Sequence, residues 1–402
     1  MAEWILVCRD CGWRHAEDQY YVACPACGGF LEVAFPSVPA EPVDRQFSSI
    51  FKYHRVMPFD PVHEDIAQFE HFEETPCVLA ERLSEKLGIE LYFKDETRMP
   101  SGTWKDREGF VSIFRLLRNK VPAFFAFSSG NTGTSLARSA SIMRGPKLHL
   151  VVPSTSQERL ATYRQFFDPK FVHVHFFEGS NDECVARAKE LAKEMGIAVE
   201  GGFTNYARRE GLKLFGLELA LAWDRKPDWY VQPVAGGIGV YALHKAYRDL
   251  GRRNECPRIL AVQAAICAPI VNAWRAGAAT LEERYVPQTV EASPYVRVLR
   301  TRRPSDSYPI LKPILDEVGG HCEDVSDQDI HEGLRLLYLD DYYKDMYRKT
   351  GTLCGLEPAT ALAGICKGAR QGYIVRGERV VLNVSGAAKA GDIQMEWIED
   401  LL

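Results

Sequence analysis

The sequence lacks an apolar run long enough to span a bilayer, and its first residues lack the basic leader of a secretory signal. It also lacks a long block of like charge, since the formal net charge is only -5 over 402 residues. These absences argue against a membrane-bound protein, a secreted protein and a general binder of nucleic-acid backbones. A small anionic ligand stays open, because it needs only a local site. We therefore expect a cytoplasmic globular protein that binds neither membranes nor nucleic acids.

Apolar residues and cysteines are both plentiful. Hydrophobic residues make up 46% of the chain and charged residues 26%, which suits large cores divided between two or more packed units. Eleven cysteines without a visible secretion signal favour reduced thiols or metal ligands over disulfides. For the assembly we expect a homodimer, since dimers are the commonest closed oligomers.

Four of the cysteines form a module of their own within residues 1–35. Two Cys-x-x-Cys pairs place the thiolates on two tight turns, and the four are Cys8, Cys11, Cys24 and Cys27. This spacing is typical of a tetrahedral zinc site in a small ribbon, and four cysteine ligands leave no open position for chemistry. We expect a structural zinc; the alternative is four free thiols on a ribbon that has lost its metal.

The rest of the chain predicts a connector at residues 36–75 followed by an α/β core at 76–402. In the core, apolar strand candidates alternate with helical periods, which predicts mainly parallel sheets with helices on both faces. The strand candidates are residues 89–96, 121–127, 147–153, 171–177, 228–234 and 379–386, and helices are expected at 104–120, 134–144 and 181–196. The segment 274–311, rich in Arg and Pro, receives no assignment.

Three turns of small and polar residues directly follow predicted strands, at residues 99–107, 128–133 and 234–239. Ligands of open α/β sheets bind at the carboxyl ends of strands, so a site is expected there. The third turn reads AGGIG and can offer backbone N–H groups beside a helix N-terminus to an anion, although such turns also serve close packing. It lacks the Lys-Ser/Thr pair of a P-loop and the GxGxxG spacing of a dinucleotide fold. The phosphate it binds would belong to a ligand other than ATP or NAD.

These motifs together resemble the fold-type II enzymes that use pyridoxal phosphate (PLP), specifically the threonine synthase and cysteate synthase group. The resemblance rests on five features in the family's order, namely the N-terminal cysteine ribbon, PSGTWKDRE, SSGNTG, EGGFTNYARREGLK and GLEPATALAG. It implies a two-domain architecture like that of the tryptophan synthase β chain. The smaller subdomain, about 106–222, would be inserted in a larger one formed by about 76–105 and 223–402.

The resemblance also implies which residues hold PLP. Lys105 would carry the cofactor as a Schiff base and later move the Cα proton, because an amine can do both. Asn131 would hydrogen-bond the ring hydroxyl oxygen, and Ser385 would face the pyridine nitrogen. The phosphate would lie on backbone amides of the AGGIG turn, from Gly236, Gly237, Ile238 and Gly239. The alternatives are a solvated helix-start lysine at 105 and a serine at 385 that satisfies its own backbone.

A small amino-acid substrate is implied as well, with binding residues in three segments. The loop before the second helix would hold the substrate carboxylate, although the same residues could be a helix cap; they are Ser128, Ser129, Gly130 and Thr132. Ser101 and Thr103 could add hydroxyl groups near Lys105. Asn205 and Arg208 are the candidates for binding a leaving phosphate, and the alternative for Arg208 is an ordinary surface ion pair.

The implied reaction is β- or γ-replacement on a small O-phospho amino acid, for example phosphoserine and sulfite giving cysteate. Threonine synthase chemistry on O-phosphohomoserine and water is the alternative, and a specialised relative with another leaving group stays open. The sequence departs from the group's pattern at Trp104, where Phe is usual, and at Glu108, where Gly is usual. From another class, the chain could be a non-catalytic protein with a PLP fold, or a nucleic-acid-associated factor using its ribbon.

Overall fold

The computed structural model describes residues 4–16, 19–60, 72–128, 130–164, 166–179, 181–223, 226–296, 298–304 and 306–402. The chain divides into two compact units. Unit 1 consists of Met1–Glu74, Met99–Glu218 and Lys245–Arg253, and unit 2 of Thr75–Arg98, Leu219–His244 and Asn254–Leu402. Unit 1 takes in residues 106–218, whereas the smaller subdomain was predicted at about 106–222, and it also takes in the N-terminal module, which the sequence had set apart.

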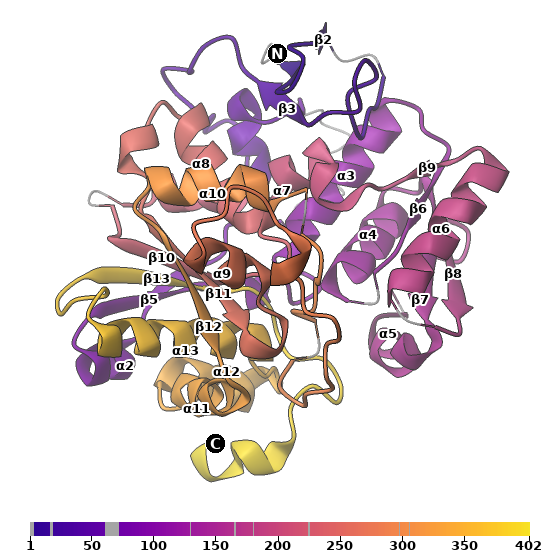
Figure 1. The fold of residues 1–402 in the computed structure, drawn as a ribbon. Coiled ribbons are helices and arrows are strands. Elements are labelled where there is room, and N and C mark those ends of the chain that lie inside the picture. Colours follow the sequence, from indigo (N-terminus) through magenta and orange to yellow (C-terminus); the bar gives the residue numbers. More distant parts are fainter. Residues whose placement is uncertain are drawn as a thin grey trace. The chain divides into compact units, whose positions relative to one another are not determined.

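Unit 1 is built on a four-stranded parallel sheet in the order β8-β7-β6-β9 (Figure 1). Its strands are β6 (Ala123–Ala126), β7 (Lys147–Pro153), β8 (Val172–Phe177) and β9 (Ala198–Val199). Alternate side chains face opposite sides of the sheet. Leu148, Leu150 and Val152 pack against one group of helices, whereas Val151 faces α6 on the other side. The predicted arrangement of a parallel sheet with helices on both faces is confirmed for this unit.

The helices of unit 1 arise where apolar residues recur at helical spacing. On one face lie α3 (Lys105–Arg118) and α4 (Asn131–Ile142), which contribute Ile113, Leu116 and Leu136 to the core. The other face is covered by α6 (Asn181–Met195) through Cys184, Ala188 and Ala192. The remaining helices are α5 (Gln157–Arg164) and α7 (Tyr206–Leu221).

The N-terminal module is a three-stranded antiparallel sheet in the order β2-β1-β3. Its strands are β1 (Ile5–Cys8), β2 (Arg14–Ala16) and β3 (Leu31–Ala34). The guanidinium of Arg209 lies 3.7 Å from the ring centroid of Phe30, and Lys245 donates to the Val33 carbonyl at 2.8 Å. These contacts explain why the module belongs to unit 1. In the predicted connector, a short 3-10 helix spans Ser49–Val56, and residues 61–71 lie outside the described part of the chain.

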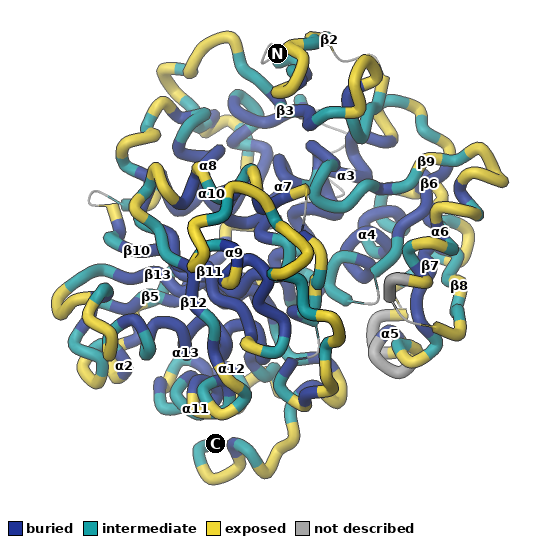
Figure 2. Tube along the Cα trace, in the orientation of Figure 1, coloured by how far each residue is buried: buried dark blue, intermediate teal, exposed yellow. Residues whose placement is uncertain are grey.

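Unit 2 contains a six-stranded sheet in the order β12-β11-β10-β13-β5-β4. All neighbours are parallel except β4 and β5. The strands are β4 (Cys77–Leu79), β5 (Glu90–Asp95), β10 (Trp229–Pro233), β11 (Arg258–Ala264), β12 (His321–Val325) and β13 (Arg379–Val384). Parallel strands are covered on both faces, and β10 and β13 are buried over almost their whole length, as Figure 2 shows.

The helices of unit 2 complete the two layers around this sheet. On one face, α13 (Leu356–Gln371) contributes Ala359, Leu362 and Ile365 to the core. The others are α2 (Glu81–Leu87), α8 (Ile238–Asp249, which continues into unit 1), α9 (Pro269–Arg275), α10 (Tyr308–Glu317), α11 (Asp327–Leu337) and α12 (Asp341–Thr350). Among the described residues, no helix is both long and apolar enough to cross a membrane.

The segment 274–311, left unassigned by the sequence, is mostly irregular backbone in the structure. Its arginines hold this backbone in place. Arg300 donates to the carbonyls of Val290 and Glu291, both at 2.9 Å, and Arg302 donates to that of Pro287 at 3.1 Å. Carbonyl groups outside helices and sheets need such donors, which explains why the segment is rich in arginine.

Candidate active site

The turn before α3 is held by its own side chains, and it places Lys105 at the first position of the helix. Asp106 accepts hydrogen bonds from the Ser101 backbone N–H at 2.6 Å and from the Ser101 hydroxyl. Thr103 Oγ1 accepts from the Lys105 N–H at 3.4 Å. Ser101 and Thr103 are buried. The hydroxyl groups of Ser101 and Thr103 thus form hydrogen bonds within the turn. Their predicted contact with the substrate stays a prediction.

The amine of Lys105 lies in a charged but largely buried setting. Lys105 Nζ is 2.5 Å from Glu108 Oε1 and 4.9 Å from the centroid of the Trp104 ring, and its side chain is 17% exposed. Burial lowers the pKa of Lys105 below its usual value, although the Glu108 carboxylate opposes that change. More of the amine is therefore neutral at a given pH than in an exposed lysine, as a nucleophile requires.

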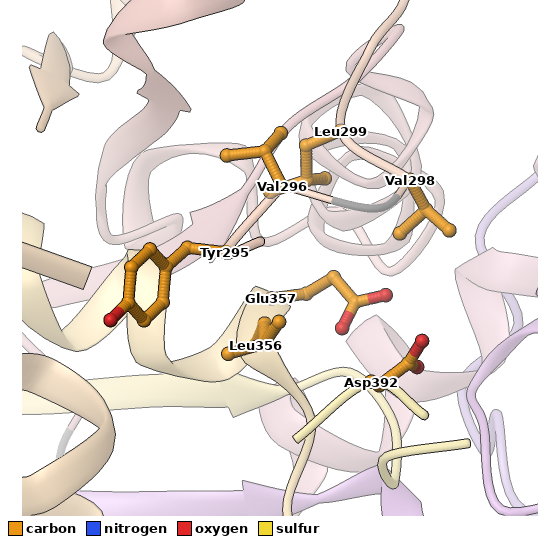
Figure 3. A pocket seen from close by; sticks show the side chains of 7 residues that line it. All are labelled: Tyr295, Val296, Val298, Leu299, Leu356, Glu357 and Asp392. Atoms are coloured by element: carbon orange, nitrogen blue, oxygen red, sulfur yellow. The ribbon is translucent and has the colours of Figure 1, made fainter. Parts of the chain in front are cut away.

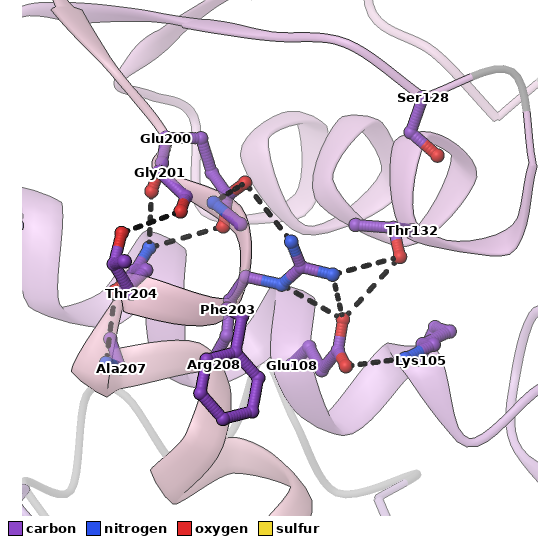
Figure 4. Close-up of polar contacts among 12 residues, drawn as sticks. Lys105, Glu108, Ser128, Thr132, Glu200, Gly201, Phe203, Thr204, Ala207 and Arg208 are labelled. Atoms are coloured by element: carbon purple, nitrogen blue, oxygen red, sulfur yellow. Dashed lines mark hydrogen bonds and ion pairs between the residues drawn. The ribbon is translucent and has the colours of Figure 1, made fainter. Parts of the chain in front are cut away.

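Glu108 joins Lys105 to Arg208, as Figure 4 shows. Arg208 donates to Glu108 Oε2 from Nη2 at 2.8 Å and from Nε at 3.1 Å. Its Nη1 donates to Glu200 Oε2 at 3.2 Å. Its Nη2 also donates to Thr132 Oγ1 at 3.2 Å. We call Lys105, Glu108, Glu200 and Arg208 the charged cluster; with both basic residues protonated and both acids ionised, its formal charge is zero.

The pKa values in the charged cluster follow from burial and pairing. Burial acts to raise the pKa of Glu108, but Arg208 and Lys105 outweigh it, so that the pKa lies below its usual value. Burial raises the pKa of Glu200, which has Arg208 as its cationic neighbour. Arg208 is indeed an ion-pair residue, as the alternative reading of the sequence held, but its side chain is only 13% exposed. It is not a surface pair.

A close approach of α3 and α7 brings Arg208 beside Glu108. A Cβ added at Gly211 would lie 2.2 Å from the Arg107 carbonyl oxygen and 2.8 Å from the Cα of Glu108. Only glycine permits this backbone contact. Arg107 on α3 also links α3 to α7, because its Nη2 donates to Oε2 of Glu218 on α7 at 2.8 Å within the buried core.

The loop before α4 supplies a helix N-terminus to the same region. Gly130 is the N-cap residue of α4, and Ser128 Oγ accepts from the Gly130 N–H at 3.4 Å. Ser129, predicted to bind the substrate carboxylate, lies outside the described residues. The side-chain oxygen of Asn131 is buried and has no hydrogen-bond partner among the described residues. Buried polar atoms normally have partners, so this orphan suits the predicted contact of Asn131 with a cofactor hydroxyl.

Asn205 has a different setting from the one that the sequence predicted. It is fully buried, and Nδ2 donates to the Glu200 carbonyl at 2.9 Å and to Glu200 Oε1 at 3.1 Å. Its Oδ1 accepts from the Tyr20 hydroxyl at 2.8 Å and from the Ala207 N–H at 2.9 Å. These partners occupy both ends of the amide, so the predicted contact with a leaving group stays a prediction that requires rearrangement.

In unit 2, the AGGIG turn joins β10 to α8 in the way that the sequence predicted. Gly237 has a φ of +78°, and a Cβ added there would lie 2.2 Å from Leu311 Cδ1. No atom lies within 4 Å of a Cβ built at Gly236, which leaves space beside the turn. The helix begins at Ile238, so the N–H groups of Ile238 and Gly239 belong to its first turn and have no partner within the helix. This geometry fits a phosphate group.

Ser385 directly follows β13 and is 5% exposed. Two residues earlier, Asn383 lies on the same side of the strand. It is fully buried, and neither of its amide atoms has a partner among the described residues. The sequence analysis did not single out Asn383 as a candidate site residue. An amide side chain within the apolar strand RVVLNV was the feature that could have drawn attention to it.

A shallow pocket of unit 2, shown in Figure 3, contains none of the predicted site residues. The carboxylates of Glu357 and Asp392 lie beside it, and Glu357 comes from the GLEPATALAG motif at the start of α13. Its remaining lining residues are Tyr295, Val296, Val298, Leu299 and Leu356.

The four cysteines of the N-terminal module converge. Their Sγ atoms all lie within 4.8 Å of one another, with Cys8 and Cys27 3.6 Å apart and Cys11 and Cys24 3.7 Å apart. Ligands at a Zn–S distance of about 2.3 Å in a tetrahedron are about 3.8 Å apart, so the cluster fits such a metal ion. Each turn is closed in the same way, by Gly12 N–H to the Cys8 carbonyl and by Gly28 N–H to the Cys24 carbonyl.

Unit 1 thus contains a largely buried amine and an amide oxygen without a partner among the described residues, and unit 2 contains a turn whose backbone geometry fits a phosphate group. Sequence reasoning noted Glu108 only as a departure and missed Glu200. The spacing of Glu108 three residues after Lys105 on one helix was the signal for the former.

The chain is similar to several known proteins in sequence and in fold. The chain is 28% identical over 392 residues to a threonine synthase from Methanosarcina acetivorans, covering 95% of this chain and 91% of that protein. It is 27% identical over 412 residues to a cysteate synthase from Methanospirillum hungatei, covering 97% and 91%. The fold matches the structure of a threonine deaminase from Solanum lycopersicum with a TM-score of 0.63 at 18% identity, covering 83% of this chain and 88% of that one.

The family model described as pyridoxal-phosphate dependent enzyme matches residues 69–386. The matched span covers most of the chain. It contains Lys105, Asn131, the AGGIG turn and Ser385. The protein belongs to the family of pyridoxal-phosphate dependent enzymes.

Proposed function

We propose that the enzyme replaces a leaving group at the β- or γ-carbon of a small O-phospho amino acid. Phosphoserine with sulfite as the nucleophile is the first candidate pair, and O-phosphohomoserine with water is the alternative. The observation that carries the proposal is the grouping, within unit 1, of the Lys105 amine, Thr132 and the Arg208 guanidinium. The names of the relatives, threonine synthase and cysteate synthase, support this reaction class.

PLP, when bound, supplies an electron sink for the charge that develops at Cα. Lys105 would hold the cofactor and accept the Cα proton at Nζ, and its lowered pKa leaves more of the amine in the neutral form that can accept a proton. The substrate carboxylate would lie at the N-terminus of α4, where the helix dipole favours an anion, and Ser128, Ser129, Gly130 and Thr132 are the residues proposed to bind it. Arg208 would bind the departing group, because a guanidinium offers paired donors to phosphate.

Further residues proposed to bind the cofactor belong to unit 2. Gly236, Gly237, Ile238 and Gly239 would hold the cofactor phosphate through backbone amides. Ser385 would face the pyridine nitrogen. A hydroxyl does not force protonation of that nitrogen as a carboxylate does, so the ring is a weaker electron sink, which favours loss of a leaving group over a long-lived carbanion.

A second candidate is a leaving group that is not a phosphate, and the pairing of Arg208 favours it. Two carboxylates, from Glu108 and Glu200, already neutralise this guanidinium. While the Lys105 amine is neutral, before it accepts the Cα proton, Arg208, Glu108 and Glu200 together carry one negative charge. A phosphate dianion would meet repulsion there, whereas an uncharged leaving group would not.

Release of inorganic phosphate separates these candidates. Purified enzyme with PLP is mixed with phosphoserine or O-phosphohomoserine, each with and without sulfite. Phosphate release from phosphoserine together with a sulfonate product supports the first candidate. Release from O-phosphohomoserine without sulfite supports the threonine synthase reaction. If the cofactor is bound and neither substrate yields phosphate, both phosphate-based reactions are excluded and another leaving group is indicated.

We further propose a structural zinc ion on Cys8, Cys11, Cys24 and Cys27, and a homodimer as the assembly. A cytoplasmic location is supported by the thiols, because all eleven cysteines are unpaired in the structure and a reducing compartment keeps them so. Metal analysis of the purified protein and its mass in solution test the first two points.

A further inference from the structure

A continuous chain of hydrogen bonds leads from the N-terminal cysteine module to Lys105. It starts at Tyr20, which lies between Cys11 and Cys24. The Tyr20 hydroxyl donates to Asn205 Oδ1 at 2.8 Å, and Asn205 Nδ2 donates to Glu200 Oε1 at 3.1 Å. Tyr20 and Asn205 are 185 residues apart in the sequence.

From Glu200 the chain enters the charged cluster drawn in Figure 4. Arg208 Nη1 donates to Glu200 Oε2 at 3.2 Å, and Arg208 Nη2 donates to Glu108 Oε2 at 2.8 Å. Glu108 Oε1 then accepts from Lys105 Nζ at 2.5 Å. Five direct contacts therefore join the module to the amine, and all of them lie within unit 1.

The packing around Tyr20 fixes the first contact of this chain. The Tyr20 ring lies 5.6 Å from the ring of Tyr206, and it packs at the edge of the core formed by α3, α4 and the sheet. Two residues further on, Val22 approaches Gly201 so closely that a Cβ there would lie 2.1 Å from Val22 Cγ1. The loop of the module is thus seated directly on the segment that carries Glu200 and Asn205.

We propose that the cysteine module completes the active site, with Tyr20 as a positioning residue for the charged cluster beside Lys105. Without the Tyr20 hydroxyl, the Ala207 N–H is the one remaining donor to Asn205 Oδ1 among the described residues, and the amide that orients Glu200 is less constrained. Glu200 in turn sets the direction of Arg208, and Arg208 holds Glu108 on the amine. The proposal rests on the proposed role of Lys105, and it does not depend on the identity of the leaving group.

The test compares Tyr20→Phe with the matched control Tyr21→Phe. Both changes remove one phenolic hydroxyl from the same loop, but the Tyr21 hydroxyl donates to the exposed Gln19 side chain, at 2.8 Å, and is not part of the chain to Lys105. The readouts are the pH midpoint of the bound cofactor's visible absorption, KM and kcat, with metal content and melting temperature measured alongside. We expect Tyr20→Phe to shift the pH midpoint and to raise KM about fivefold, the effect typical of one lost hydrogen bond. We expect Tyr21→Phe to change neither.

A double variant tests whether the effect passes through Glu200. Tyr20→Phe combined with Glu200→Gln is expected to be within about twofold of Glu200→Gln alone, because residues in one network are not additive. Independent, multiplied effects would overturn the proposal, and so would a Tyr20→Phe enzyme that matches Tyr21→Phe in pH midpoint and KM. If Tyr20→Phe does not fold, the variant Asn205→Asp is used instead, because it removes the Nδ2 group that donates to Glu200. An unshifted pH midpoint of the cofactor absorption in Asn205→Asp would also overturn the proposal. A wild-type protein without a cofactor band would instead contradict the role of Lys105.

Discussion

Replacing Glu108 by glutamine tests how charge in the site selects the leaving group. Glu108 is fully buried, and its Oε2 lies 2.8 Å from Arg208 Nη2. A phosphate bound to that nitrogen would therefore lie about 5 Å from the carboxylate. At an effective dielectric constant of about 20, two unit charges at this distance repel by about 3 kcal/mol. Rearrangement reduces this value, so we expect Glu108→Gln to improve binding of a phosphate-bearing substrate by about 1–3 kcal/mol.

This change in free energy corresponds to a KM for phosphoserine or O-phosphohomoserine that falls by about fivefold to 150-fold. The assay is phosphate release at steady state, with kcat recorded separately because glutamine also loses the ion pair to Lys105. Glu190→Gln is the control, since Glu190 lies on the exposed face of α6 with its side chain 64% exposed. An unchanged KM in Glu108→Gln, with cofactor bound, would refute the electrostatic reasoning.

Three further outcomes follow from the structure. Glu218→Gln leaves the buried guanidinium of Arg107 without its carboxylate, so we expect a loss of about 3–5 kcal/mol in the free energy of unfolding, measured by urea denaturation; a loss below about 1 kcal/mol would contradict it. Burial lowers the pKa of Lys105, so the rate at which PLP-free protein binds PLP should rise with pH through a midpoint below 10.5. A midpoint at or above 10.5 would contradict the burial of this amine. Gly237→Ala introduces a clash with Leu311 at a positive φ, and we expect PLP affinity, measured by titration, to fall about tenfold or more; wild-type affinity would show that the turn does not hold the phosphate.

The strands and helices that carry the motifs were predictable because local signals determine them. The strand candidate 379–386 became β13, and the helix candidate 104–120 became α3 with Lys105 at its start. Both have strong apolar periodicity, and their boundaries are marked by turn residues. The two mainly parallel sheets followed from the alternation of such segments, and in the structure only β4 and β5 pair antiparallel among the described strands of these two sheets.

Contacts between distant segments were not predictable in this way. The role of Asn205 depends on Tyr20, and the pairing of Arg208 with Glu108 spans 100 residues. No local pattern reports such pairs, because the fold brings them together. The grouping of the N-terminal module with unit 1 has the same origin, since Arg209 on α7 stacks on Phe30.

The most direct test of the central claim is to locate the cofactor on the chain. The purified enzyme is treated with borohydride, which makes the bond between PLP and its lysine permanent, and is then digested and analysed by mass spectrometry. We expect a single phosphopyridoxyl group on Lys105, which is lost in Lys105→Ala. A label on another lysine, or none on protein saturated with PLP, would contradict it.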